Sequence, residues 1–431
     1  MTAKQLERRL EAILPPEQII VGSELRAAYT VDGKGPAVIV RPCNALQTAQ
    51  VLALCNEEGA SIIPWGGGTQ ISLGNPPRSY DVALDLSDLD AIHEYDAANL
   101  TLTAGAGCTL GVLAERLAEG RQFLPLDPPL AERATLGGVM AAGAFGPSRL
   151  RYGAPRDLAL GLEAALVTGE VIDVGGKTVK NVAGYDLTRL FIGSYGTLGI
   201  ITRVTCRLLP LPAASQTVFV GFRAAESALA LAGAIIGSKL LPTSLDVLSG
   251  DPLEGNADLA ACLVIGVDGS PETVERQERE LRALAGRAGA ASVKLLDAAS
   301  AANARRLARD LPATSKAGLA LRAGLPLAAQ ARWWAGLAER PGVTLLARAG
   351  LGIVYALAEV EARETAGLVT MARQLAGELG GYVVIERAPI ELKSRLDVWG
   401  EGRPDLALMR ELKRKFDPQG ILNPGRFMGR L

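Results

Sequence analysis

The chain has 431 residues, which is enough for two or three domains that each bury a self-sufficient core. Hydrophobic residues make up 48% and charged residues 21%, so a disordered, collagen-like or disulfide-scaffold chain is excluded. The 45 Lys and Arg residues nearly cancel the 46 Asp and Glu residues, so no overall field attracts nucleic acid or an anionic membrane. A charged partner must therefore be bound by local groups.

The numbers and positions of the cysteines and the histidine limit the kinds of catalytic and metal site that the chain can form. The five cysteines lie far apart without a CxxC pair, which favours reduced thiols over a disulfide framework or a zinc ribbon. The single histidine, His93, excludes a Ser-His-Asp triad and most metal sites, so we assign no metal ligand and leave the catalytic residues unknown. No stretch approaches 18 uninterrupted apolar residues, and residues 1–14 form a charged amphipathic pattern without a signal-peptide core. These features predict a cytoplasmic protein without a transmembrane segment.

The first half of the chain alternates short strands, glycine turns and helices. Apolar and period-two patterns predict strands, and 3.6-residue patterns predict helices. The predicted strands are 37–42, 61–66, 81–89, 99–107, 158–167, 170–176 and 197–210, and the predicted helices are 45–59 and 110–120. This order predicts an α+β domain with mixed sheets, ending at the PLP of Pro210 to Pro212.

Beyond Pro212, longer Ala-rich helices alternate with strands. The predicted strands are 215–222, 243–249, 261–269, 292–297, 318–324, 343–350, 352–359 and 381–389, and the predicted helices are 226–240, 272–286 and 363–379. This pattern favours a central antiparallel sheet backed by helices. Residues 405–427 read as one amphipathic helix, stopped by Asp417-Pro418, and then a Pro/Gly-rich extended segment.

A glycine turn follows the predicted strand at 61–66. Pro64, Gly66, Gly67, Gly68, Thr69 and Gln70 form a segment in which backbone N–H groups can converge on an anion such as a pyrophosphate. The segment matches neither a P-loop nor the start of a Rossmann helix. Two further glycine patterns, at 105–111 and 171–178, fail the spacing required for NAD or NTP binding and are rejected.

Five segments in order carry a resemblance to a known family. They are PWGGGT at 64, TLGGVMAAGAFG at 135, RYGxxRD at 151, GGKTVKNVAGYDLTRLF at 175 and GSYGTLGIIT at 193. They resemble the FAD-binding domain of the vanillyl-alcohol oxidase (PCMH) type, and KRKFDPQGILNPGRF at 413–427 resembles the end of FAD-linked 2-hydroxy-acid oxidases. The resemblance implies an FAD domain at 1–212, an α+β cap domain at 213–403 and a tail at 404–431 that returns to the FAD domain.

The resemblance also implies roles for the matched residues. The turn at 64–70 would hold the FAD pyrophosphate through backbone amides. A second contact loop would contain Thr135, Leu136, Gly137, Gly138 and Gly143, and further backbone contacts would come from Gly196, Gly199 and Ile200. The loop with Lys180, Asn181, Tyr185 and Asp186 would cover the flavin or face a partner, with turn and capping chemistry as the alternative.

One departure from the catalytic members of this family bears on function. Those relatives have a histidine-rich cluster in the C-terminal half, whereas no histidine follows His93 here, so FAD should be bound noncovalently. Oxidation of a 2-hydroxy acid needs a base for the hydroxyl proton and a cation for the carboxylate. The cation could come from Arg322, Arg348, Arg387 or Lys393, although each is more simply explained as a surface or salt-bridge residue.

The segment KNVAGYDLTRLFIGSYGTLG looks most like the FAD-binding subunit of bacterial glycolate oxidase complexes. The resemblance implies that a homologous, histidine-bearing FAD-linked subunit oxidises glycolate or D-lactate and that an iron–sulfur subunit accepts electrons. Membrane association would then come through these partners. Two alternatives stay open: a self-sufficient FAD-linked 2-hydroxy-acid dehydrogenase, and a scaffold that has lost FAD.

Overall fold

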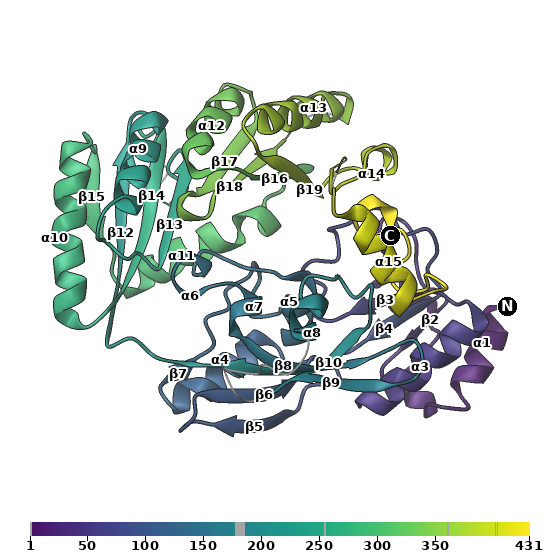
Figure 1. Ribbon diagram of the computed structural model, residues 1–431. Coiled ribbons are helices and arrows are strands. Elements are labelled where there is room, and N and C mark those ends of the chain that lie inside the picture. The colour runs from purple at the N-terminus through teal and green to yellow at the C-terminus, as the bar shows by residue number, and fades with distance from the viewer. Residues whose placement is uncertain (1, 177–185, 254–255, 360–361, 401, 403) are drawn as a thin grey trace.

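The computed structural model describes residues 2–176, 186–253, 256–359, 362–400, 402 and 404–431. It has a lower body with two small sheets, an upper body with one large sheet, and a C-terminal segment that returns to the lower body (Figure 1). Lys180, Asn181 and Tyr185 lie outside the described residues. Among the described residues, no helix has the length and apolarity to cross a bilayer.

The first sheet of the lower body has four strands in the order β1-β2-β4-β3. Strands β2, β4 and β3 are parallel, and β1 pairs antiparallel with β2. The buried helix α3 (Ala45–Glu58) connects β2 to β3, begins at the Asn44 cap and ends at Gly59, whose φ of 65° suits glycine. The other elements here are α1 (Ala3–Leu10), β1 (Ile19–Ile20), α2 (Ser23–Ala27), β2 (Val38–Val40), β3 (Ile62–Trp65) and β4 (Val82–Asp85).

The second sheet has five antiparallel strands in the order β5-β6-β10-β8-β9. Helix α5 (Leu136–Ala142) packs against β10 and β6 with an apolar face that includes Val139 and Met140. The remaining elements are β5 (Ile92–Asp96), β6 (Thr101–Gly105), α4 (Leu110–Glu119), α6 (Arg149–Tyr152), α7 (Pro155–Leu158), β8 (Ala159–Ala165), β9 (Val171–Gly175), α8 (Leu187–Phe191), β10 (Ile200–Arg207) and the small pair β7 (Gln122–Phe123) and β11 (Leu209–Pro210). His93 is exposed on β5.

The upper body is an eight-stranded antiparallel sheet in the order β15-β12-β14-β13-β17-β18-β16-β19. Its outer face is covered by α9, α10, α12 and α13 (Figure 1). The strands are β12 (Ala214–Phe222), β13 (Ser244–Ser249), β14 (Ala261–Gly269), β15 (Ser292–Leu295), β16 (Leu319–Gly324), β17 (Val343–Arg348), β18 (Ile353–Ala358) and β19 (Tyr382–Arg387), and the helices are α9 (Ala225–Ile236), α10 (Pro271–Arg287), α11 (Ala298–Thr314), α12 (Gln330–Ala338) and α13 (Ala362–Glu378). The predicted α+β class and the antiparallel sheet backed by helices are confirmed, whereas α11 was not predicted.

Successive side chains along each strand of the upper sheet point to opposite faces of that sheet. On β12, Val218 and Val220 join the core under the outer helices, whereas Phe219 joins a second cluster with α11. The second cluster includes Leu346 and Tyr355 and is contacted by Phe145 of the lower body. The inner face of the large sheet therefore faces the lower body.

The C-terminal segment lies alongside β3. After α14 (Ile390–Arg395) and α15 (Leu406–Phe416), the chain turns at Asp417. The Ile62 N–H donates to the Ile421 carbonyl at 2.8 Å, and the Asn423 N–H donates to the Ile62 carbonyl at 2.8 Å. Lys413 is buried and donates to Asp417 at 2.5 Å, which fixes the turn. The last residues are thereby placed next to the glycine turn that follows β3.

Candidate functional site

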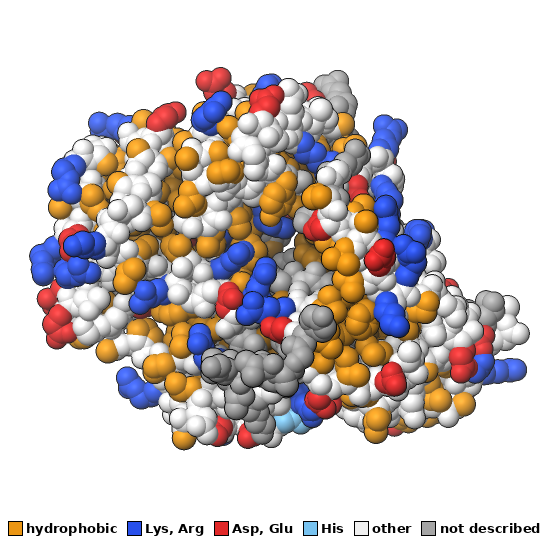
Figure 2. All heavy atoms as spheres, in the orientation of Figure 1, with side chains coloured by type: hydrophobic (Ala, Val, Ile, Leu, Met, Phe, Trp, Pro, Cys, Tyr) orange, Lys and Arg blue, Asp and Glu red, His pale blue; other side chains and the backbone are white. Residues whose placement is uncertain are grey.

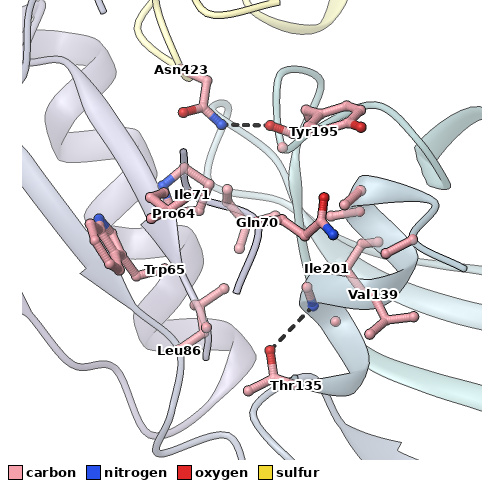
Figure 3. A pocket seen from close by; sticks show the side chains of 18 of the residues that line it. Pro64, Trp65, Gln70, Ile71, Leu86, Thr135, Val139, Tyr195, Ile201 and Asn423 are labelled. Carbon is pink, nitrogen blue, oxygen red and sulfur yellow. Dashed lines mark hydrogen bonds between the residues drawn. The ribbon is translucent and has the colours of Figure 1, made fainter. Parts of the chain in front are cut away.

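The predicted glycine turn lines a cavity, which we call the glycine cavity. Its walls come from the β3 turn, helix α5, the start of β10 and the C-terminal segment (Figure 3). Residues that line it include Trp65 to Ile71, Leu86, Thr135, Gly137, Gly138, Val139, Tyr195 to Thr197, Gly199 to Ile201, Trp399, Asn423, Arg426 and Phe427. Segments from opposite ends of the sequence, such as Trp65 and Phe427, therefore meet at one site.

The turn at 66–70 presents unbonded backbone N–H groups. Trp65 anchors its start, because the indole is buried and donates to the Tyr80 hydroxyl at 2.6 Å. Gly68 has a φ of 68°, which only glycine adopts freely. None of the five N–H groups from Gly66 to Gln70 donates to another described residue. Successive free amides at a cavity wall form an anion-binding concavity.

The backbone amides of the loop before α5 are hydrogen-bonded within the protein. The N–H groups of Leu136 and Gly137 donate to the carbonyls of Cys108 and Ala106, each at 2.8 Å. The Gly138 N–H donates to the Thr135 hydroxyl at 3.4 Å (Figure 3). The amides that begin this helix therefore have protein partners and are not free for a phosphate.

Close packing explains the glycines where the two loops meet. A Cβ on Gly66 would overlap the Thr135 hydroxyl, and a Cβ on Gly67 would overlap the Arg133 carbonyl oxygen. A Cβ on Gly137 would overlap Ala106 in the same way. The absent side chains let the β3 turn and the α5 loop lie against each other beside the cavity.

The C-terminal segment adds polar groups with unmet hydrogen-bonding capacity. Asn423 donates to the Tyr195 carbonyl at 2.5 Å (Figure 3), and its buried Oδ1 has no partner among the described residues. Arg426 is buried, donates to the carbonyls of Ile71 and Leu73, and forms no ion pair with a described residue. Burial lowers the pKa of Arg426 to about 10, and Asp32 opposes this shift in part. A buried cation without an ion-pair partner suits an anionic ligand.

Three aromatic side chains close the cavity. The rings of Tyr195 and Trp399 are 4.9 Å apart, and those of Tyr195 and Phe427 are 5.4 Å apart. Tyr195 has a φ of 55°, a left-handed conformation that is uncommon for a non-glycine residue. Burial raises the pKa of the Tyr195 phenol, so this group is protonated at neutral pH. The cluster is an apolar wall and not a base.

A second cavity adjoins the first, and the two share Ala142 and Tyr195. It lies between α6, α7 and the inner end of the upper sheet, and in the space-filling view Lys and Arg side chains lie close to the hollow between the two bodies (Figure 2). Three arginines line it, so we call it the arginine cavity: Arg149, Arg156 and Arg322. Its described lining contains no Asp or Glu.

The structure separates the four predicted cations. Only Arg322 lines a cavity, and it is paired with Glu386. Arg348 is fully buried, with its Nη1 3.6 Å from Asp246 Oδ1, and burial raises the pKa of Asp246 to about 7.

The other two cations hold the backbone. Arg387 donates to the carbonyls of Ala313, Ser315 and Ala317. Lys393 donates to the Ser72 carbonyl at 2.9 Å and to the Asp32 carboxylate at 2.5 Å. Their roles in this structure are therefore structural.

Twelve of the fourteen predicted cofactor residues line the glycine cavity. The two others are Leu136, which is buried in the core of the lower body, and Gly143, which ends α5 with a φ of 60° and lines the arginine cavity. Asp186 caps α8 by accepting the Arg189 N–H, which matches the capping alternative. Sequence reasoning missed Asn423 and Arg426, although the 413–427 segment that contains both carried part of the resemblance.

The chain matches two family models. An FAD binding domain matches residues 36–175, and the C-terminal domain of FAD linked oxidases matches residues 211–325 and 399–427. The glycolate oxidase subunit GlcD of Bacillus subtilis is 30% identical over all of this chain and 98% of its own length. The chain belongs to the FAD-linked oxidases. It is an FAD-dependent oxidoreductase with a PCMH-type FAD-binding fold, as predicted.

Further relatives agree with this family. This FAD-linked oxidase is 31% identical to the D-lactate dehydrogenase of Archaeoglobus fulgidus over 91% of the chain and 92% of the relative. It is 39% identical to the glycolate oxidase subunit GlcE of Escherichia coli over 36% of the chain and 43% of that subunit. Among solved structures, an alkyldihydroxyacetonephosphate synthase has a TM-score of 0.77 at 18% identity, covering 98% of this chain and 85% of that one. p-Cresol methylhydroxylase has a TM-score of 0.73 at 17% identity, covering 98% and 96%.

The glycine cavity fits FAD on its own geometry. Free amides at 66–70 and the buried Arg426 suit the negative charge of a pyrophosphate, and the aliphatic and aromatic walls suit the rings. The described linings of both cavities contain no His, Asp, Glu or Lys. Among the described residues, no cluster of three or more potential metal ligands is present.

Proposed function

We propose that this FAD-linked oxidase is the FAD-binding subunit of a glycolate oxidase-type 2-hydroxy-acid dehydrogenase complex. A homologous FAD-linked subunit would oxidise glycolate or D-lactate, and an iron–sulfur subunit would accept the electrons. The observation that carries this proposal is that the described linings of both cavities have no His, Asp, Glu or Lys side chain to act as a general base. The similarity of part of the chain to GlcE supports it.

The cofactor would be held by backbone and aromatic contacts. The amides of Gly66 to Gln70 and the guanidinium of Arg426 would hold the pyrophosphate, and Gly196, Gly199 and Ile200 would contact the rings through the backbone. The described lining has no His or Cys to which a flavin could be linked, which supports noncovalent binding. When bound, FAD would supply a carrier for the electrons that the partner subunit removes from the 2-hydroxy acid.

The domain division belongs to the same proposal. An FAD domain at 1–212 and a cap at 213–403 would be joined by a tail at 404–431 that completes the FAD site. The hydrogen bonds from Ile62 and Asn423 across β3 support the return of the tail. We place the complex in the cytoplasm, with membrane association only through the partner subunits.

The test is a visible spectrum of the purified chain, before and after anaerobic addition of glycolate or D-lactate. A flavin band near ~450 nm that acid releases into solution would support a noncovalent carrier of redox chemistry. We expect neither acid to bleach the band until the partner subunits are added. Bleaching of the isolated chain would exclude the accessory role, and a protein that refuses FAD would favour the scaffold alternative.

One observation favours a second candidate, a self-sufficient dehydrogenase. The arginine cavity adjoins the glycine cavity and could bind a carboxylate, and the D-lactate dehydrogenase relative matches nearly full length. This candidate requires a proton acceptor other than His, Asp, Glu or Lys, since the described linings contain none of these four. Steady-state turnover of the isolated chain with an artificial acceptor separates the two candidates, because the subunit proposal predicts turnover only in the assembled complex.

A further inference from the structure

Helix α11 belongs to the upper body and lies between the large sheet and the lower body (Figure 1). Its buried face packs through Ala304 and Ala308 against Phe219 and Tyr355 on the inner face of the sheet. Asp310, near the end of this helix, is only 7% exposed. A carboxylate is unfavourable both in a buried position and near a helix C-terminus, so Asp310 does not stabilise α11 itself. Its charge needs compensating hydrogen bonds.

Arg309 and Asp310, which we call the α11 clamp, hold a loop of the lower body. Asp310 accepts the Leu130 N–H at 2.8 Å. Arg309 donates to both carboxylate oxygens of Glu132, at 3.0 and 3.1 Å, and to both oxygens of Asp310, at 2.8 Å each. Burial alone would raise the pKa of Asp310, but the hydrogen bonds from Arg309 and Leu130 outweigh it and lower that pKa, so Asp310 is charged at neutral pH.

The two contacts of the α11 clamp differ in strength. The Glu132 side chain is 66% exposed, and an ion pair with an exposed partner contributes little. Asp310 is buried, and its hydrogen bond from Leu130 is charge-assisted. The α11 clamp therefore acts mainly through Asp310.

The loop held by the α11 clamp supports the turn that follows β3. Leu130 has a φ of 56°, a left-handed conformation that a non-glycine residue keeps only where its surroundings fix it. Its carbonyl accepts the N–H groups of Arg133 and Ala134, at 3.0 and 3.1 Å, so Leu130 begins a tight turn. That turn places the Arg133 carbonyl against Gly67, where a Cβ would overlap it. The hydrogen bond from Leu130 to Asp310 therefore fixes the residue on which the position of Arg133 depends.

We propose that Asp310 is a positioning residue for the turn at 66–70, so that the upper body contributes to FAD affinity from outside the glycine cavity. Asp310 holds Leu130, which begins the turn that carries the Arg133 carbonyl. That carbonyl supports Gly67 and so keeps the free amides aligned. The inference rests on the proposed placement of the FAD pyrophosphate at 66–70, and it does not depend on assignment to a complex. Because coupling between sites is reciprocal, FAD binding should in turn stabilise the Leu130 turn.

The first test compares FAD affinities by titration of the apoproteins with FAD. Asp310→Ala removes the acceptor of the Leu130 N–H, and alanine keeps the helix intact. We expect the FAD dissociation constant to rise at least about fivefold, the lower end of typical couplings between sites. Asp310→Asn keeps a neutral oxygen acceptor and should lose less affinity than Asp310→Ala.

Tyr152→Phe is the matched control. The Tyr152 hydroxyl also joins the two bodies, because it donates to Asp268 of β14 at 2.8 Å, but this contact does not involve the loop at 130–134. Tyr152 lines neither cavity. We expect Tyr152→Phe to keep the wild-type FAD affinity, even where urea unfolding shows a loss of stability similar to that of Asp310→Ala.

Hydrogen exchange gives a second readout that a purely structural role of Asp310 would not change. We expect FAD to protect a peptide covering 128–134 in the wild type, although the Leu130 N–H is bonded to Asp310 and not to the cofactor. This protection should be lost in Asp310→Ala. Protection by FAD that is confined to 66–70 in the wild type would overturn the proposal.

The affinities can overturn the proposal in two further ways. FAD affinity could be unchanged in Asp310→Ala, or it could fall equally in Tyr152→Phe, which would mean that the loss comes from a general loosening between the bodies. Gly67→Ala separates a failure of the positioning role from a failure of the FAD site. A loss of FAD affinity in Gly67→Ala but not in Asp310→Ala would exclude only the positioning role, whereas normal affinity in both variants would exclude the site as well. The subunit role is tested separately, by the flavin spectrum.

Discussion

Two glycine-rich segments meet at the glycine cavity, the proposed FAD site, and use glycine for different purposes. The turn at 66–70 leaves five consecutive N–H groups without a described partner. The loop at 135–138 has its amides bonded to Cys108, Ala106 and its own Thr135. Both segments line the glycine cavity, but only the first offers donors for an anion.

The difference teaches how a glycine motif should be interpreted. Gly68 is needed for a left-handed turn, whereas Gly137 is needed because Ala106 occupies the place of a side chain. Gly66 and Gly67 are needed because they border the other loop, and they also carry free amides. A run of glycines therefore predicts that another group lies close to the backbone. Whether that group is a ligand or another part of the protein is shown by which backbone N–H groups already have hydrogen-bond partners.

The largest effect should come from Gly67→Ala. Its Cβ would overlap the carbonyl oxygen of Arg133, so one of the two loops must move and the amides at 66–70 must lose their alignment. We expect at least a tenfold loss of FAD affinity and a loss of about 3 kcal/mol in unfolding free energy, the upper range for overpacking. Titration of the apoprotein with FAD and urea unfolding measure the two effects.

Gly286→Ala is the matched control for this variant. Gly286 lies near the end of α10, is exposed, and has open space where a Cβ would lie. There the substitution should raise stability by about 0.5–1 kcal/mol, because alanine favours a helix. Normal FAD affinity in Gly67→Ala would show that the turn does not hold the cofactor.

Removal of FAD should change the hydrogen-exchange rates of the two segments differently. We expect the amides of 66–70 to exchange rapidly in the apoprotein and to be protected at least tenfold on FAD binding, since only the ligand can accept their hydrogen bonds. The amides of 136–139 should be slow in both states. Hydrogen exchange measured by mass spectrometry on peptides covering each segment gives the two protection factors. Equal protection of both segments by FAD would contradict the inference that only the 66–70 amides bind the cofactor.

The fold was predictable wherever one local pattern decided an element. The apolar run at 215–222 identified a strand of the upper sheet, and the helical pattern at 45–59 identified α3 to within one residue. Helix α11 was not predicted because its buried face consists mostly of alanines, such as Ala304 and Ala308, so the hydrophobic pattern is weak. Propensity alone would have indicated it.

The site was predictable only in its backbone part. The glycines at 66–68 stand together in sequence, so the turn was visible. Arg426 and Arg149 reach the cavities through long-range folding, and no spacing in the sequence relates either residue to the turn. The sequence also could not show which backbone amides lack a hydrogen-bond partner. Gly66 and Gly137 both stand in glycine-rich segments, and only the tertiary structure gives a partner to the Gly137 N–H and none to the Gly66 N–H.

A smaller effect is expected for Gly137→Ala. Its Cβ would overlap Ala106, so we expect a loss of about 1–3 kcal/mol in unfolding free energy. FAD affinity should fall less than in Gly67→Ala, because the Gly137 amide is bonded to the Ala106 carbonyl and not to the ligand. The ratio of the two dissociation constants is the measurement, and a greater FAD loss in Gly137→Ala would reverse our assignment of the two segments.

The smallest effect should come from Thr135→Val, which replaces a hydroxyl by a methyl group of similar shape. The hydroxyl accepts the Gly138 N–H, so its removal should cost about 1 kcal/mol of stability through the lost cap. Thr109→Val is the matched control, since Thr109 caps α4 in the same way and does not line the glycine cavity. We expect the two variants to lose similar stability in urea unfolding and to keep FAD affinity within about twofold, the scale of a few tenths of a kcal/mol. A selective tenfold loss of FAD in Thr135→Val would mean that the hydroxyl binds the cofactor, and the α5 loop would then be a ligand contact as well as a packing surface.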